Sequence, residues 1–106
     1  MSGQLNDIPG TENTLSNKVT RVTTTYSVLT TDNKVFCNTD SAGFTATLPT
    51  GTQDLTFRIT NSGSSGNTLT VAVQTGEDIY GTTNGTHLLY DGESADLTYD
   101  TTDGWY

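Results

Sequence analysis

The sequence contains few positively charged side chains, one cysteine, one histidine and no long hydrophobic run. Only four of its 106 residues are Lys or Arg, against twelve Asp or Glu, so the formal net charge is -8 at pH 7. A nucleic-acid-binding protein needs a cationic surface to release counterions from phosphates, and an anionic membrane attracts basic segments in the same way. The charge balance therefore excludes nucleic acid as a partner and disfavours a membrane surface.

Two further absences limit the class of protein. No segment approaches the roughly 20 apolar residues that span a bilayer, and the N-terminus lacks the basic and apolar regions of a secretion signal. We therefore predict no membrane insertion and no secretory route. Cys37 is the only cysteine, which excludes a disulfide within the chain and favours a small buried thiol or a reducing compartment.

Apolar side chains are also scarce, at 31% of the sequence. Leu, Ile, Val and Phe make up about a fifth of the chain, which approaches the composition at which a lone core fails to offset chain entropy. The strand patterns are nevertheless too regular for a disordered chain. We therefore expect subunits to bury additional surface against one another in a homo-oligomer.

Apolar residues alternate with Thr, Ser and other polar residues at a period of two, and no helical spacing is sustained. The pattern predicts an all-β domain over residues 18–106, built as an antiparallel β-sandwich or a jelly-roll-like barrel. Two hairpins are expected, one joining 54–60 to 68–73 and one joining 87–90 to 95–99. The other predicted strands are 19–29, 34–38, 44–48 and 79–80.

Residues 1–17 contain no aromatic residue and include the breaker pair Pro9-Gly10. We interpret them as an extended or flexible arm, because so few apolar side chains cannot form a core. Such an arm is suited to lying along a partner. Its predicted partner-binding residues are Leu5, Ile8, Pro9 and Leu15.

Catalytic and metal-binding patterns are weak. His87 is the only histidine, so one chain cannot build a two-histidine metal site, and no G-x-S-x-G motif occurs. A Ser–His–Asp or Cys37–His87 pair stays open on composition alone. The carboxylates of Glu77-Asp78 and Asp91-Gly92-Glu93 are expected to bond their own turns, with a glycosidase pair or a Ca²⁺ shared between subunits as alternatives. We predict no catalytic residue, metal or cofactor, and no enzyme.

Aromatic side chains gather in the second half of the chain. We expect them to fill the core and an oligomer interface, since amphipathic rings suit both places, with stacking on sugars as the alternative. These residues are Tyr80, Tyr90, Tyr99, Trp105 and Tyr106.

Six short segments resemble a β-rich module that recurs in tail-fibre and head decoration or appendage proteins of tailed bacteriophages. They are YSVLTTDNKVFCNTD (26–40), GFTATLPTG (43–51), FRITNSGSSGNTLTV (57–71), EDIYG (77–81), LLYDGESADL (88–97) and DGWY (103–106). The resemblance implies a structural role in the virion and a homotrimer. It implies no catalytic residue, and Cys37 has no counterpart in the pattern.

A short arm before the module leaves no room for a fibre shaft. We therefore predict a decoration or cement protein on the capsid (head) surface, which binds the major capsid protein through residues 1–17 and the rim of the oligomer. The alternative is a receptor-binding tip or adhesin module of a tail fibre, attached to a fibre partner and contacting glycan on the host surface.

Overall fold

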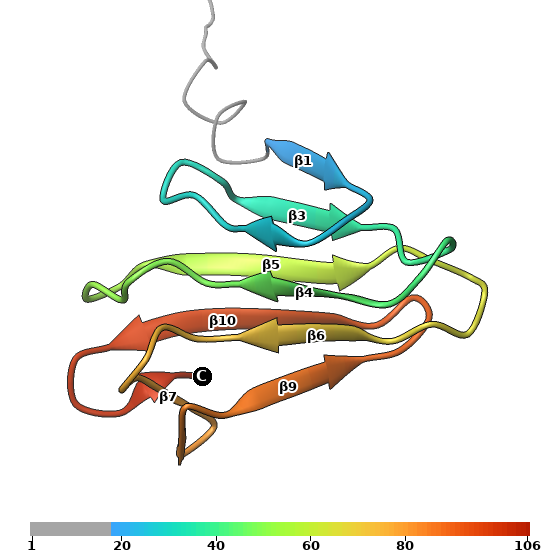
Figure 1. The fold of residues 1–106 in the computed structure, drawn as a ribbon. Coiled ribbons are helices and arrows are strands. Elements are labelled where there is room, and N and C mark those ends of the chain that lie inside the picture. The colour runs from blue at the N-terminus through green and yellow to red at the C-terminus, as the bar shows by residue number, and fades with distance from the viewer. Residues whose placement is uncertain (1–17) are drawn as a thin grey trace, which may run out of the picture.

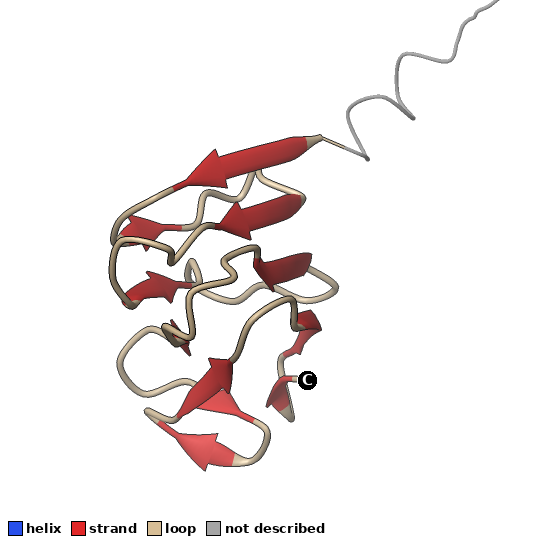
Figure 2. Cartoon of the chain, turned by 90° about the vertical axis from the view of Figure 1, so that its right-hand side faces the viewer, coloured by secondary structure: helices blue, strands red, loops and turns tan. Residues whose placement is uncertain are grey.

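The structure is a computed structural model that describes residues 18–106, and this part of the chain contains strands and no helix (Figure 1, Figure 2). The strands are β1 (Val19–Val22), β2 (Tyr26–Ser27), β3 (Lys34–Cys37), β4 (Phe44–Thr47), β5 (Thr56–Asn61), β6 (Leu69–Ala72), β7 (Asp78–Ile79), β8 (Thr82–Thr83), β9 (Thr86–Leu89), β10 (Ser94–Asp100) and β11 (Gly104–Trp105). They form a seven-stranded sheet, β1-β3-β5-β10-β11-β7-β8, and a four-stranded sheet, β2-β4-β6-β9. The predicted all-β class is confirmed.

The first six strands wind through the two sheets as a solenoid. They alternate between the sheets, so β1, β3 and β5 are neighbours in one and β2, β4 and β6 are neighbours in the other. All four of these neighbouring pairs are parallel. Each turn of the chain therefore adds one strand to each sheet (Figure 1). The fold is a β-solenoid, and the predicted antiparallel sandwich or barrel is wrong.

The last strands close the solenoid with antiparallel pairs. β9 runs antiparallel to β6 at the end of the four-stranded sheet, and β10 runs antiparallel to β5 in the other sheet. Both predicted hairpins are wrong, because β5 and β6 lie in different sheets, as do β9 and β10. The expected turns exist, but they carry the chain from one sheet to the other rather than back along the same sheet.

Most predicted strand positions are confirmed, with two differences. The single long strand predicted over 19–29 is two strands, because Arg21 pairs with Phe36 in one sheet and Tyr26 pairs with Ala46 in the other. The second difference concerns two short strands that were not predicted: β8, which pairs with β7, and β11, which pairs with β10 and β7. Residues 1–17, including the predicted contacts Leu5, Ile8, Pro9 and Leu15, lie outside the described residues.

The core lies between the sheets and is filled by alternate residues of each strand. In the seven-stranded sheet, Val35, Ile59 and Ala95 stand side by side and point inward. Ala46 and Val71 form a matching row in the four-stranded sheet. Their alternation with polar residues explains the period of two in the sequence. The fully buried set includes Trp105, Phe57, Leu48, Leu69, Ile79, Leu89 and Leu97.

A buried polar residue joins the bends at one side of the solenoid. The Asn61 side-chain amide donates to the carbonyl oxygens of Asn67 and Leu89, at 3.0 Å each. Its oxygen accepts from the Thr39 hydroxyl at 2.8 Å and from the Gly63 N–H at 3.0 Å. All four hydrogen-bonding positions of the amide are thus used, which is what a fully buried Asn requires.

A buried carboxylate has the corresponding role at another bend. Asp32 accepts hydrogen bonds from the Leu29 N–H at 2.9 Å, the Tyr26 hydroxyl at 2.7 Å and the Thr20 hydroxyl at 2.8 Å. Burial opposes the charge of Asp32, but these hydrogen bonds and the charge of Lys18 outweigh it and lower the pKa of the carboxyl. Burial of Tyr26 and its hydrogen bond to Asp32 raise the pKa of Tyr26 to about 12. Asp32 is thereby held as a carboxylate that ties β1 and β2 together.

Candidate binding surfaces

The four-stranded sheet contains no charged residue. Its strands β2, β4, β6 and β9 have no Asp, Glu, Lys or Arg, whereas the seven-stranded sheet contains all the charged strand residues. Alternation with the buried positions places Ser27, Thr45, Thr47, Thr70, Ala72, Thr86 and Leu88 on the outward side. We call this surface the neutral face. It presents hydroxyl and methyl groups on a protein whose net charge is -8.

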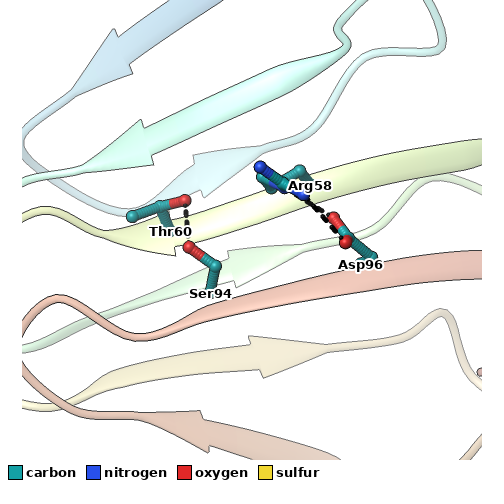
Figure 3. A network of polar contacts seen from close by, with 4 residues as sticks. All are labelled: Arg58, Thr60, Ser94 and Asp96. Atoms are coloured by element: carbon teal, nitrogen blue, oxygen red, sulfur yellow. Dashed lines mark hydrogen bonds and ion pairs between the residues drawn. The ribbon is translucent and has the colours of Figure 1, made fainter.

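The outward side of the seven-stranded sheet is charged and hydrogen-bonded. Arg58 binds Asp96 through two contacts, Nε to Oδ1 at 2.7 Å and Nη2 to Oδ2 at 3.0 Å, and Thr60 and Ser94 are joined at 2.7 Å (Figure 3). The guanidinium lowers the pKa of Asp96, but both side chains are largely exposed, so solvent screens the pair. Lys34 is the neighbour of Arg58 on β3. This side resembles an ordinary solvated surface.

Among residues 18–106, strand β1 stands at the end of the seven-stranded sheet and pairs with β3 alone. Within this part of the chain no strand pairs with its other side, and a sheet edge of this kind presents N–H and C=O groups to another strand. β1 begins one residue after Lys18, the first residue that the structure describes (Figure 1). Arg21, which lies over the Phe36 ring at 5.7 Å, gives the edge a cationic side chain.

The five aromatic residues predicted at an interface or ligand site divide into buried and exposed groups. Trp105 is fully buried and Tyr99 packs against it, with ring centroids 5.2 Å apart. Trp105 is a core residue of this chain, and Tyr99 is a partly buried residue packed against that core. Tyr80, Tyr90 and Tyr106 are exposed, by 44%, 55% and 53% respectively. Only these three are placed to contact a partner or ligand.

Tyr80 contacts both Tyr106, another exposed tyrosine, and the single histidine. The rings of Tyr80 and Tyr106 are 5.8 Å apart at an interplanar angle of 85°, and Tyr80 lies 4.9 Å from His87 at 64°. We call these three residues the aromatic cluster. The two tyrosines were expected from the sequence as interface or ligand residues, but His87 was not. No local sequence signal marks the contact of Tyr80 with His87 or with Tyr106.

The backbone of the aromatic cluster is unusual at Tyr80. Tyr80 and Gly81 form the two-residue turn between β7 and β8, with φ of 49° and 82°. Turns with two positive φ values favour Asn or Asp followed by Gly, because a bulky side chain is strained there. The strain is held by the surrounding sheet, since the Tyr80 N–H donates to the Trp105 carbonyl at 2.9 Å.

The candidate catalytic groups have structural contacts. Burial raises the pKa of the Cys37 thiol to about 12, which removes the thiolate that a nucleophile needs. Glu77 accepts hydrogen bonds from the Gly51 N–H and the Trp105 indole. Asp91 accepts from the Gly66 N–H, and Glu93 from the Tyr90 N–H. These carboxylates therefore support turns and loops.

Residues 18–106 contain no group of three or more His, Cys, Asp or Glu side chains arranged to hold a metal ion. Within the same residues, no helix is long and apolar enough to cross a membrane. No protein-family profile matches the chain, and no curated protein is similar enough in sequence to indicate a family. The function of the protein is therefore inferred from the neutral face, the β1 edge and the exposed tyrosines.

Proposed function

We propose that this protein is a structural protein of a bacteriophage virion that decorates the capsid surface. The observation that carries the proposal is the neutral face, a sheet surface without charge on a chain of net charge -8. Burying charged side chains in an interface costs desolvation free energy, whereas hydroxyl and methyl groups are buried at much lower cost. The neutral face is therefore the surface best suited to permanent contact with the shell or with other subunits.

The edge of β1 that is unpaired among the described residues supports the same orientation. Residue 18 directly precedes β1, so the proposed arm, residues 1–17, and this edge together would contact the major capsid protein. The resemblance of six segments to a bacteriophage module, which is commonly trimeric, agrees with a homotrimer on the shell. In this arrangement the charged side of the seven-stranded sheet faces solvent.

Co-sedimentation with capsids tests the proposal. The intact protein should pellet with capsids that lack it, and light scattering should give three times the chain mass of 11.3 kDa. Thr70→Lys places a charge at the centre of the neutral face and should abolish pelleting. Thr56→Lys places the same charge on the outward side of the other sheet and should leave pelleting unchanged.

Deleting residues 2–17 tests the arm separately. The shortened protein should lose capsid binding while keeping the β-type circular dichroism spectrum of the intact protein. Normal capsid binding by the shortened protein would show that the arm is not the attachment site. A monomer of 11.3 kDa that never pellets with capsids would overturn the proposed function.

The exposed tyrosines favour a second candidate, the receptor-binding tip of a tail fibre. Tyr80, Tyr90 and Tyr106 project from the molecule, and exposed tyrosine rings supply rigid, amphipathic contact area for glycans. Selective binding of the protein to host cells or to purified surface polysaccharide, without capsid binding, would support this candidate against decoration.

A further inference from the structure

The aromatic cluster forms a corner that is open to solvent. Two rings at 85° to each other leave a space beside them that is flanked by a face of each ring. Tyr80 and Tyr106 are each about half exposed, so part of each ring is accessible to a ligand, and Tyr80 also contacts His87. Aromatic faces carry the negative part of the ring quadrupole and attract cations.

The backbone that carries the two tyrosine rings is hydrogen-bonded to neighbouring strands. The Tyr106 N–H donates to the Thr98 carbonyl at 3.0 Å, and the Thr98 N–H donates back to the Tyr106 carbonyl. Tyr80 is held through the carbonyl of fully buried Trp105. These hydrogen bonds hold the backbone of the turn at Tyr80 and of the residue after β11, which preorganises the site and reduces the entropy lost when a ligand binds.

Charge around the cluster selects the sign of the ligand. No Lys or Arg follows Arg58 in the sequence, and seven carboxylates occur between residues 77 and 103. Arg58 itself is paired with Asp96. The potential over this end of the chain is therefore negative, which attracts cations and repels acidic saccharides and phosphates.

We infer that the corner between Tyr80 and Tyr106 binds an organic cation through cation–π contact. The shared chemistry is a quaternary ammonium or guanidinium group, which loses little hydration free energy when it leaves water. Its source is an arginine side chain of a partner protein, because the net charge of -8 disfavours a membrane surface. The positive φ of Tyr80 is backbone strain of the kind that clusters at binding sites.

Titrations with matched probes test the inference on the intact protein. Nuclear magnetic resonance shifts of the Tyr80, His87 and Tyr106 amides are followed with choline and with its neutral analogue 3,3-dimethyl-1-butanol. An arginine-containing peptide and the same peptide with neutral citrulline form the second pair. The arginine-containing peptide should bind and the citrulline peptide should not, whereas binding of choline alone would indicate a lipid headgroup instead.

Variants distinguish a binding role from a structural one. Tyr106→Leu should weaken cation binding about 2- to 30-fold, the range of cation–π contacts, while Tyr90→Leu should leave it unchanged. Tyr80→Asn should weaken binding while raising the melting temperature, because Asn suits the turn. A ring that merely covers the core would give a lower melting temperature.

Three results would overturn the inference. The first is equal binding of a cation and its neutral analogue. The second is an absence of shifts with every cation up to high millimolar concentration. The third is loss of stability, with binding unchanged, in Tyr80→Asn. Binding of a neutral saccharide in place of any cation would likewise overturn it and would support the tail-fibre candidate.

Discussion

Asn61 is the residue on which the bends of the solenoid most depend. Its amide satisfies two carbonyl groups, one hydroxyl and one N–H, and two of these partners, Thr39 and Leu89, are far from Asn61 in the sequence. Buried polar groups that lose their partners keep their full desolvation cost. We therefore infer that the hydrogen bonds of Asn61 contribute strongly to the stability of the bends that they join.

We expect Asn61→Ala to lower the free energy of unfolding by about 2–4 kcal/mol, because it leaves several buried groups without a partner. Urea denaturation monitored by Trp105 fluorescence measures the change. Ser62→Ala, the adjacent exposed position, is the matched control and should change stability by less than about 0.5 kcal/mol. Equal effects of the two variants would show that the Asn61 network contributes little.

Asp32 should make the fold sensitive to acid. Its pKa is lowered in the folded protein, so its contribution is complete above the ordinary Asp pKa of 3.8 and is lost as the pH falls through the lowered value. Asp32→Asn should cost about 1.5–3 kcal/mol at pH 7, the usual value of hydrogen bonds to a charged group. It should also flatten the decline of stability below about pH 4.

Denaturant titrations of the wild type and Asp32→Asn between pH 2 and 7 provide the measurement. Asp40, Asp96 and Asp100 also have lowered pKa values, through their own hydrogen bonds, and their contributions remain in both proteins. The difference between the two curves thus isolates Asp32. Curves that stay parallel over this range would contradict the assignment.

At the scale of elements, β11 is the connection that completes the seven-stranded sheet. It pairs antiparallel with β10 and parallel with β7, and it places Trp105 in the core. Gly104 makes this contact close. A Cβ added there would lie 2.7 Å from the Asp78 carbonyl oxygen, and the residue has a φ of 83°.

Two glycine variants separate the steric effect from the backbone effect. Gly92 has a comparable φ of 74°, but a Cβ there would meet nothing within 4 Å. Gly92→Ala should therefore cost only the left-handed backbone penalty, about 1–2 kcal/mol. Gly104→Ala should cost at least about 1 kcal/mol more, because β11 and β7 must also move apart. Equal costs in thermal denaturation would mean that the β11–β7 contact is easily relaxed.

At the scale of the whole molecule, stability should rise from the open end of the solenoid toward its middle. Among the described residues, β1 and β2 each have one neighbouring strand, whereas β5 lies between β3 and β10, and β6 between β4 and β9. In a solenoid, each coil is stabilised mainly by its neighbours. Terminal coils therefore open more readily than central ones.

Hydrogen exchange should show this gradient. Amides bonded within the sheets should exchange fastest in β1 and β2 and slowest in β5 and β6, when measured on the free protein. If β1 and the neutral face contact a capsid, binding should slow exchange in β1, β2 and β4 and leave β10 unchanged. Uniform exchange rates across all strands would contradict a coil-by-coil stability gradient.

The sequence by itself determined the class of fold and the positions of most strands. Alternation of Leu69, Val71 and their polar neighbours specifies which side of a strand is buried, and this signal is local. It also determined the separation of turns from strands, since Gly, Asn and Asp mark backbone that leaves a sheet. The lack of positive charge likewise follows from composition alone.

Only the tertiary structure decided which strands are neighbours and in which direction they run. A turn such as 61–67 has the same composition whether it reverses the chain within one sheet or carries it across to the other. The choice depends on contacts between distant residues, such as Asn61 with Leu89, which no short segment contains. The neutral face and the aromatic cluster arise in the same way, because each combines strands or residues that are separated along the chain.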